Sequence, residues 1–344
     1  MTRWAMSAAS LGVALGAIGC HTPAPPPGPP AWQTVFDDTT LGGAVLSAWG
    51  TGPEDVYVVG GPLGDSGYPA VAVHYDGSAW TRLSPGGTSS FWWVSGSGAE
   101  DVWMVGENGR MTHWDGAAFV DHPPLTTATV WGVWAASPTD AWAVGGTPEG
   151  GTAQPNDLVL HWDGASWTQQ TLPGTPLGRS LNKVWGTASD DLYAVGESGT
   201  IWHRKGTTWA LETNPATSNL LTVYGCGATD VYAVGGQDVL HSSGDGTWTQ
   251  VAVTLGNSVN GVTCGAGGEV LLVGYGGLKQ RLVNGKWINE FALEPYSDLH
   301  GSWADGDGAF WTAGGDFASP AVAGKARDAV IARYGAGTVT TLTP

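Results

Sequence analysis

Charged residues are scarce in this sequence, and positively charged ones are the scarcest. Lys and Arg together number 13 of 344 residues, against 30 Asp and Glu, which gives a formal net charge of −17 at pH 7. Charged residues make up 12% of the chain, where about 25% is usual. A surface of this kind repels phosphate backbones and anionic lipid head groups, so we expect no nucleic-acid partner.

The chain also lacks an apolar run long enough to span a bilayer as a helix. Small and apolar residues run without interruption over Ala8–Gly19, which is too short to cross about 30 Å of hydrocarbon. The run follows a segment with one Arg and no acidic residue, a pattern typical of secretory signals. We therefore predict a signal peptide over residues 1–19.

Cysteine is rare too, and the first of the three lies directly after this run. The segment Ala17–Cys20 resembles a bacterial lipobox, which implies cleavage before a lipidated Cys20 and a place at the outer membrane or cell surface, with the periplasmic side also open. The alternative is an ordinary secretory signal with an incidental cysteine. Residues 20–30 are rich in Pro and predict a stiff tether. Membrane contact would then be through the lipid anchor alone.

Glycine and tryptophan, by contrast, are abundant, with 55 and 20 copies. Glycine costs about 1 kcal/mol against alanine inside a helix and favours tight turns, so a turn-rich β-protein is expected. The motif of Trp49–Gly60 recurs, and its Asp appears at Asp55, Asp101, Asp140, Asp191 and Asp230, with Glu269 and Ala309 at the same place in the last two repeats. This spacing is close to the period of four-stranded propeller blades. We predict an all-β fold, a single seven-bladed β-propeller over residues 31–344.

Each repeat divides into four short strands, a to d. In the first repeat we expect strands at 46–49, 55–59, 70–75 and 80–83. Asp-Gly pairs between strands c and d, at 76–77, 115–116 and 163–164, predict hairpins with type I′ turns. The segment Trp32–Phe36 matches strand d alone and is expected to close the ring outside blade seven, whose own last strand is predicted at 338–342.

The sequence from about residue 32 to its end resembles bacterial surface β-propeller lipoproteins, with blades in the style of WD-repeat, Asp-box and tectonin-type propellers. The segment Trp162–Trp167 looks like an Asp-box shortened by one residue. The resemblance implies the fold. Such propellers include lectins, scaffolds, assembly factors and hydrolases, so the function has to be inferred from the site.

Residues that recur in every blade are expected to serve the scaffold. Histidine occupies one strand c position in five successive repeats, and arginine takes it in the last two: His74, His113, His161, His203, His241, Arg281 and Arg333. Five equivalent histidines around a ring cannot converge on one metal, so we predict hydrogen bonds within each blade. The repeated strand d tryptophans, such as Trp167, are predicted to pack in the core.

Departures from the repeat indicate the functional face. The b-to-c connections are long at 61–69, 146–157 and 315–328 and rise from one face, and long loops tend to carry function. At the mouth on this face we place Trp92, Trp93, Trp131, Arg179, Asn182, Asn260, Tyr296, Asp298 and His300. Indole rings with amide, guanidinium and carboxylate groups suit a neutral or amino sugar, or a peptide. The alternative is that the tryptophans only fill the hub.

No metalloprotease or phosphate-loop motif is present, and the Ser in 64–69 lacks a triad context. Acidic residues on the long loops, Asp65, Glu149, Asp157 and Asp316, leave a glycan-cleaving enzyme as the alternative to a binding module. The sequence favours binding of a glycan or a surface or periplasmic protein by a monomer. No cofactor is predicted; Asp305–Gly308 resembles a calcium loop, but a simple turn is the better interpretation.

With Cys20 lipidated, Cys226 and Cys264 remain. They lie near the ends of adjacent inner strands on the face opposite the long loops. In an oxidising compartment they form a disulfide if their Cα atoms lie within about 7 Å, and otherwise they are two buried thiols.

Overall fold

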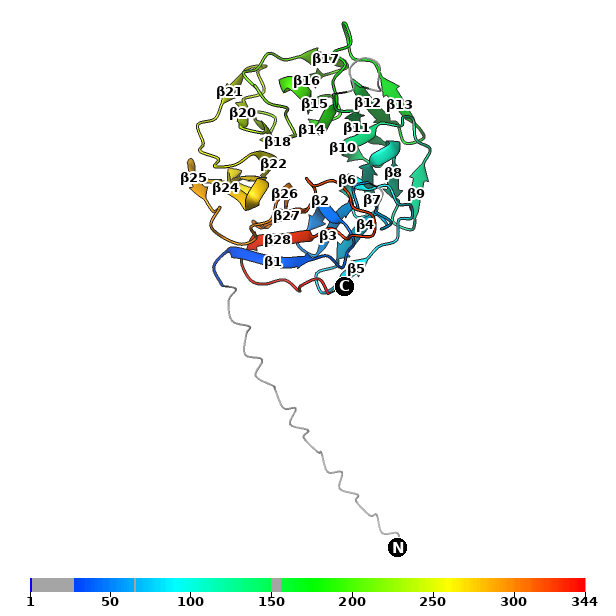
Figure 1. Cartoon of the computed structure of the whole chain (residues 1–344), viewed down its shortest axis with the longest axis vertical. Coiled ribbons are helices and arrows are strands. Elements are labelled where there is room, and N and C mark those ends of the chain that lie inside the picture. The colour runs from blue at the N-terminus through cyan, green and yellow to red at the C-terminus, as the bar shows by residue number, and fades with distance from the viewer. Residues whose placement is uncertain (2–27, 65, 150–155, 344) are drawn as a thin grey trace.

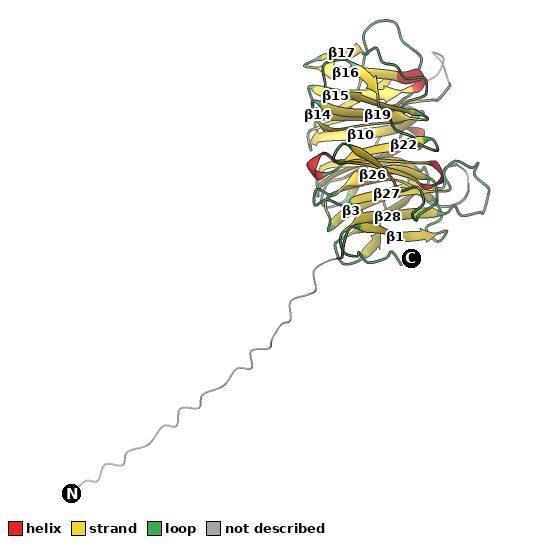
Figure 2. Cartoon of the chain, turned by 90° about the vertical axis from the view of Figure 1, so that its left-hand side faces the viewer, coloured by secondary structure: helices red, strands yellow, loops and turns green. Residues whose placement is uncertain are grey.

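The computed structural model describes residues 1, 28–64, 66–149 and 156–343. The predicted signal peptide and Cys20 lie outside this range, except for Met1. Seven four-stranded antiparallel sheets are arranged around a central axis (Figure 1). Seen from the side, the strands form a thick disk with connections on both faces (Figure 2). The prediction of a seven-bladed β-propeller is confirmed.

The blades follow one another in sequence, each running from an inner to an outer strand. The first four consist of β2 (Ala44–Gly52), β3 (Asp55–Gly61), β4 (Val71–Tyr75), β5 (Trp80–Arg82); β6 (Phe91–Gly98), β7 (Asp101–Gly106), β8 (Met111–Trp114), β9 (Phe119–His122); β10 (Thr129–Ser137), β11 (Asp140–Gly146), β12 (Leu158–Trp162), β13 (Trp167–Gln170); and β14 (Leu181–Ala188), β15 (Asp191–Gly196), β16 (Thr200–Lys205), β17 (Thr208–Leu211).

The last three blades consist of β18 (Thr222–Gly227), β19 (Asp230–Gly235), β20 (Asp238–Ser242), β21 (Trp248–Gln250); β22 (Val259–Cys264), β23 (Val270–Gly274), β24 (Leu278–Val283), β25 (Lys286–Asn289); and β26 (Leu299–Ala304), β27 (Phe310–Gly315), β28 (Ala329–Gly335), β1 (Ala31–Asp38). Short helical turns η1 (Glu107–Gly109), η3 (Glu197–Gly199) and η5 (Tyr275–Gly277) make the b-to-c connections of blades two, four and six, and η4 (Ala266–Gly268) makes an a-to-b turn. None of the helices in the described ranges is long and apolar enough to cross a membrane.

The ring closes through the first strand of the protein. β1 pairs antiparallel with β28 and is the outermost strand of blade seven (Figure 1). The separate last strand expected at 338–342 does not form, so that prediction is wrong. Because β1 occupies the edge of the sheet, residues 338–342 run along its outside instead, where the Leu342 N–H donates to the Val35 carbonyl at 3.0 Å and Gln33 exchanges two hydrogen bonds with the backbone of Val339.

The Asp-Gly hairpins between strands c and d form as expected, but their turns differ from type I′. At the first of them only Gly77 has a positive φ, of 88°. The Asp76 carboxylate instead accepts the N–H groups of Ser78 and Ala79 at 2.9 and 2.8 Å. These backbone donors lower the pKa of Asp76 to about 2. The turn is therefore built by the aspartate side chain, and a left-handed Asp is not needed.

The repeated histidines form hydrogen bonds within their blades, as predicted, and their partners are the repeated aspartates. In five blades the histidine Nε2 lies 2.6–2.9 Å from the carboxylate of the Asp that begins strand b. Each imidazole also packs on the aromatic residue two positions after that Asp, with ring centroids 3.9–4.9 Å apart. In blade six, Arg281 replaces the histidine and lies 3.4 Å from Glu269. These pairs tie strand c to strand b inside a blade.

Apolar side chains fill the space between neighbouring blades. Strand b is buried on both faces, as in β7, where every residue is buried. Some contacts between inner strands leave no room for a side chain: a Cβ atom at Gly225 of blade five would overlap the ring of Trp185 in blade four. The predicted core residue Trp167 is 7% exposed. The packing is therefore continuous around the ring.

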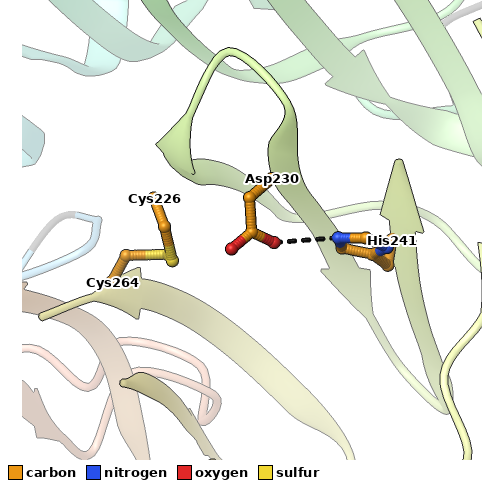
Figure 3. Close-up of a disulfide and its surroundings, with 4 residues drawn as sticks. All are labelled: Cys226, Asp230, His241 and Cys264. Atoms are coloured by element: carbon orange, nitrogen blue, oxygen red, sulfur yellow. Dashed lines mark hydrogen bonds and ion pairs between the residues drawn. A yellow bond between two sulfur atoms is a disulfide. The ribbon is translucent and has the colours of Figure 1, made fainter. Parts of the chain in front are cut away.

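A disulfide joins the inner strands of blades five and six. Cys226 and Cys264 have Cα atoms 5.1 Å apart and are bonded (Figure 3). Of the two alternatives left open by the sequence, the structure has the bridge. It lies beside the Asp230–His241 pair (Figure 3), on the face that carries the a-to-b turns.

Candidate functional site

A β-bulge at the start of the inner strand produces the mouth of the propeller. The register between strands a and b shifts by one residue in six blades, and the extra residues are Leu46, Trp92, Trp131, Asn182, Asn260 and His300. A bulged residue leaves the ladder and its side chain is redirected. Five of the nine positions that the sequence indicated as the mouth are therefore positions at which the backbone bulges out of the ladder: Trp92, Trp131, Asn182, Asn260 and His300.

Four of the predicted site residues line one pocket on the long-loop face. It has a volume of about 240 Å³ and is lined by Trp92, Trp131, Pro148, Asn182, Lys183, Glu197, Asn219, Leu221 and His300. We call it the upper pocket. Trp92 and Trp131 are half-buried, and their ring centroids lie 4.5 Å apart in an edge-to-face arrangement. The two indoles that sequence analysis singled out are thus in direct contact.

The aromatic contact continues beyond the two tryptophans. From Trp92 the series of ring contacts passes to His300 at 5.5 Å, to Phe317 at 5.2 Å and to Tyr275 at 5.6 Å. We call these five residues, from Trp131 to Tyr275, the aromatic arc. It crosses blades three, two, seven and six, and each of its rings is half-buried. The sequence did not indicate Phe317 or Tyr275 as site residues. Phe317 lies on the long b-to-c loop of blade seven and Tyr275 on the b-to-c turn of blade six, and the repeat does not show that these two connections lie close together.

Most polar side chains around the upper pocket already bind the backbone of a neighbouring strand or loop. The Asn182 amide donates to the Leu220 carbonyl at 2.8 Å, and His300 Nδ1 donates to the Leu46 carbonyl at 2.8 Å. The Glu197 carboxylate accepts the N–H groups of Glu149 and Ser180 at 2.8 and 2.7 Å. Burial is the main reason that the pKa of His300 falls to about 3, so its imidazole is neutral. The pocket therefore offers mainly apolar faces.

Lys183 and Trp93 lie in contact at the boundary between the upper pocket and a second pocket among the inner strands. Lys183 is 4% exposed; its Nζ donates to the Trp131 carbonyl at 2.9 Å and lies 4.0 Å from the centroid of the Trp93 ring. Burial lowers the pKa of Lys183 to about 7. Lys183 borders both the upper pocket and this second, lower pocket of about 100 Å³ lined by Trp93. Sequence analysis placed Trp93 at the mouth, whereas the structure places it at this boundary.

The other predicted site residues do not line the upper pocket. Asn260 is 3% exposed and donates to the Leu299 carbonyl at 3.0 Å, which links blade six to blade seven. Arg179 donates to the Thr200 hydroxyl at 2.9 Å. The Asp298 carboxylate accepts the Gly276 N–H at 2.7 Å. Tyr296 is 59% exposed on the loop that leads into blade seven.

Arg327, which sequence analysis did not single out, holds two of the long loops together. Its guanidinium is 5% exposed and donates to the carbonyls of Pro62 and Asp316 at 2.6 and 2.7 Å. The loops at 61–69 and 315–328 therefore form one wall beside the aromatic arc. The third long loop contributes Pro148 to the upper pocket, while residues 150–155, like Asp65 of the first loop, lie outside the described residues.

Two of the loop carboxylates proposed for catalysis, Asp157 and Asp316, have local backbone or side-chain partners. Asp157 accepts the Gly178 N–H at 2.7 Å, and Asp316 lies 3.9 Å from Arg327. Glu149 is exposed. At the acidic turn, Asp305 accepts the N–H groups of Asp307 and Ala309 at 3.0 Å. Among the described residues no group of three or more His, Cys, Asp or Glu is arranged to hold a metal ion.

Comparison with known proteins identifies the fold. No protein-family model matches the sequence, and no curated protein matches it either. Solved structures do match: YCF48 bound to D1 peptide aligns with a TM-score of 0.63 at 15% identity, covering 91% of this chain and 97% of that one.

Two further solved propellers align equally well. The WD40 β-propeller domain of Doa1 has a TM-score of 0.64 at 10% identity and covers 88% of this chain and 97% of its own. Virginiamycin B lyase from Staphylococcus aureus has a TM-score of 0.66 at 12% identity, with 88% and 99% covered. Identities this low show the β-propeller fold alone.

Proposed function

We propose that this protein is a recognition module that binds an extended segment of a protein partner across the aromatic arc. The observation that carries the proposal is the continuous line of five rings over the mouth, joined by four ring contacts from Trp131 to Tyr275. A row of half-buried rings beside a pocket offers apolar area with little side-chain entropy to lose, which is the composition of interface hot spots. An extended peptide segment can contact all five rings along this line, whereas a compact ligand would contact only some of them.

The hydrogen bonds around the pocket favour a protein segment over a glycan. A sugar needs polar side chains that point at its hydroxyl groups. Here the Trp131 indole N–H donates to the Gly146 carbonyl at 2.9 Å, the Asn182 amide donates to Leu220, and the oxygen of Asn219 accepts the Ser198 N–H at 2.8 Å. Few of these groups are free for hydroxyls, whereas apolar side chains of a peptide need only the ring faces.

Two further considerations support the proposal. YCF48, which shares the fold, has been solved with a bound peptide, so a propeller of this architecture is compatible with peptide binding. The lipobox-like segment ending at Cys20 and the Pro-rich residues after it lead us to propose export and attachment through a lipid anchor at the outer membrane or cell surface. The partner would then be a surface or periplasmic protein.

The test uses a random peptide display library and a glycan array, both probed with the purified protein. Selected peptides are measured by fluorescence anisotropy against the wild type and Trp92→Ala. We expect the substitution to weaken binding by about thirtyfold, which corresponds to about 2 kcal/mol, as is typical of a hot spot. Phe317→Ala, at another point of the arc, is expected to weaken the same peptides.

The matched control is Tyr224→Ala, which removes a half-buried ring from the lower pocket at the opposite end of the propeller's central channel. It should leave peptide affinity unchanged. Peptides that lose affinity with Tyr224→Ala and keep it with Trp92→Ala would show that the site is on the other face. Binding on the glycan array without any peptide selection would show that the partner is a glycan, and cleavage of that glycan, detected by mass spectrometry, would identify an enzyme.

A further inference from the structure

Lys183 is a buried cation without an anion. Its side chain is 4% exposed, and no carboxylate of the described residues lies within ion-pair distance of it. An ammonium group has three donors, and the Trp131 carbonyl accepts one of them. Buried lysines are rare unless they are paired. The structure therefore retains an unfavourable group at the floor of the upper pocket.

Other blades have glycine at the position that Lys183 occupies in blade four. At the inner-strand position of Lys183, blade three has Gly132 and blade seven has Gly301. A Cβ atom on Gly132 would lie 3.0 Å from Lys183 Cα and 3.2 Å from Lys183 Cδ, and one on Gly301 would lie 2.5 Å from the Leu46 carbonyl oxygen and 3.3 Å from the ring of Trp93. The two glycines thus allow the inner strands to approach closely, and they also leave the space that the lysine and the indole occupy. The lysine is a fitted part of the channel, unlike a surface charge.

A second donor without an acceptor belongs to the same pocket. Trp92 Nε1 is buried and has no hydrogen-bond acceptor among the described residues. Trp92 and Lys183 both line the upper pocket. A buried N–H without a partner costs about 1–3 kcal/mol. A ligand that places a hydrogen-bond acceptor at Trp92 Nε1 removes this cost, and its binding is strengthened accordingly.

The other ionisable groups of the pocket leave this place open to an anion. Glu197 lines the pocket, but both of its oxygens accept backbone N–H groups. His300 is neutral because burial, followed by the charge of Lys183, lowers its pKa. The fall in the pKa of Lys183 is caused by burial alone, without a contribution from Glu197. No carboxylate of the described residues therefore pairs with the ammonium.

We infer that the upper pocket receives a carboxylate from the bound segment, held by the Lys183 ammonium and the Trp92 indole N–H. The inference rests on the proposed function for the nature of the partner. One carboxylate oxygen accepts from Nζ and the other from Nε1, and the apolar rings around them exclude water. Charge-assisted hydrogen bonds of this kind are about twice as strong as neutral ones. The carboxylate belongs either to an Asp or Glu side chain or to the C-terminus of the partner.

The first experiment does not depend on any peptide. Fluorine NMR measures the binding of 4-fluorophenylacetate and of 4-fluorophenylacetamide, which have the same ring and differ in charge, to the purified protein. We expect the acid to bind about tenfold more tightly than the amide, because only the acid pairs with the ammonium. Equal affinities, a preference for the amide, or no binding of the acid at millimolar concentration would each overturn the inference.

Three variants test which residues cause the preference. Lys183→Met keeps the length of the side chain and removes its charge, and it should abolish the preference for the acid. Trp92→Phe keeps a ring and removes the N–H, and it should reduce the preference. Lys279→Met is the matched control: Lys279 is also fully buried, but it lies in blade six and donates to the carbonyls of Gly277 and Pro295 at 2.7 Å. Circular dichroism confirms that each variant is folded, and Lys183→Gln replaces Lys183→Met if that variant is not. A preference that survives the loss of Lys183 would refute its role.

The second experiment identifies the source of the carboxylate and separates the two proposals. Peptides selected by display are remade with an amidated C-terminus, and separately with Gln or Asn in place of Glu or Asp. Loss of affinity on amidation indicates a C-terminal carboxylate, and loss on side-chain neutralisation indicates an internal acid. Peptides that bind the aromatic arc with neither dependence would refute the inference and leave the proposed function intact. If the acid binds in a Lys183-dependent manner but no peptide is selected, the carboxylate site is supported and the proposed peptide-binding function is refuted.

Discussion

Replacement of Lys183 by Met is expected to stabilise the protein at neutral pH. Burial lowers the pKa of Lys183 from 10.5 to about 7, and each pKa unit corresponds to 1.36 kcal/mol. Burial of Lys183 therefore lowers the free energy of unfolding at pH 7 by about 4 kcal/mol relative to burial of a neutral side chain. The hydrogen bond to Trp131 and the contact with the Trp93 ring offset about 2–3 kcal/mol of this cost in stability. Met should thus raise the free energy of unfolding by about 1–2 kcal/mol.

The pH dependence of this difference is the sharper test. The unfolded chain binds a proton at Lys183 up to about pH 10.5, whereas the folded protein releases it near pH 7. The penalty is therefore complete below about pH 7 and declines as the pH rises toward 10.5. By pH 9 it should have fallen to about 2 kcal/mol, so that wild type and Lys183→Met become nearly equal in stability.

Guanidinium unfolding followed by tryptophan fluorescence, at pH 7, 8 and 9, measures both quantities. Lys286→Met, which changes an exposed lysine, serves as the control and should differ from wild type by the same small amount at every pH. A difference between wild type and Lys183→Met that does not change from pH 7 to pH 9 would refute the argument. Such a result would mean that Lys183 is charged at no cost, and hence solvated or paired.

The remaining predictions concern the scaffold. Trp167→Ala, at a core position that is 7% exposed, should cost about 3–5 kcal/mol of stability, whereas Trp92→Ala at the mouth should cost clearly less by thermal melting; equal losses would make Trp92 a packing residue. His203→Ala should destabilise more than His241→Ala, because His203 lies 2.8 and 2.7 Å from two carboxylates and its side chain is 3% exposed against 32%; chemical denaturation checks the order. Thiol titration of the denatured, unreduced protein should find no free thiol from the inter-blade disulfide, and serine in place of either cysteine should cost about 3–4 kcal/mol for a loop of 38 residues.

The fold could be predicted from the sequence because the pattern of one blade occurs in seven repeats. An Asp that recurs in five repeats sets the period, and the histidine in strand c recurs in the same five repeats, so an atypical repeat can be aligned by comparison with the others. Closure was predicted only in part: 338–342 has the pattern of a strand d, but so does β1, and two segments with one pattern compete for one edge. Local sequence does not decide that competition.

The candidate site could be predicted only where it breaks the repeat. Trp92 and Trp131 stand out because the equivalent bulged residues of other blades are Leu46, Asn182, Asn260 and His300, none of which has an indole ring. Lys183 also breaks the pattern, since its equivalents include Gly132 and Gly301, and a lysine aligned with glycines was the signal that was missed. The position of Phe317 could not be predicted, because it depends on the conformation of the long loop at 315–328, which the repeated pattern does not specify.

Closure of the ring by β1 has a consequence for the order in which the protein is made. Among the strands of the propeller, β1 is synthesised first, and its partner β28, from Ala329 to Gly335, is synthesised last. At 5–20 residues per second the ribosome needs about 15–60 s to cover that distance. For all of this time the strand has no partner within its own polypeptide, and blade seven cannot be completed. The ring therefore completes blade seven from the first and the last strands of the propeller to be synthesised, and premature termination before β28 would leave β1 and β27 without their shared neighbour.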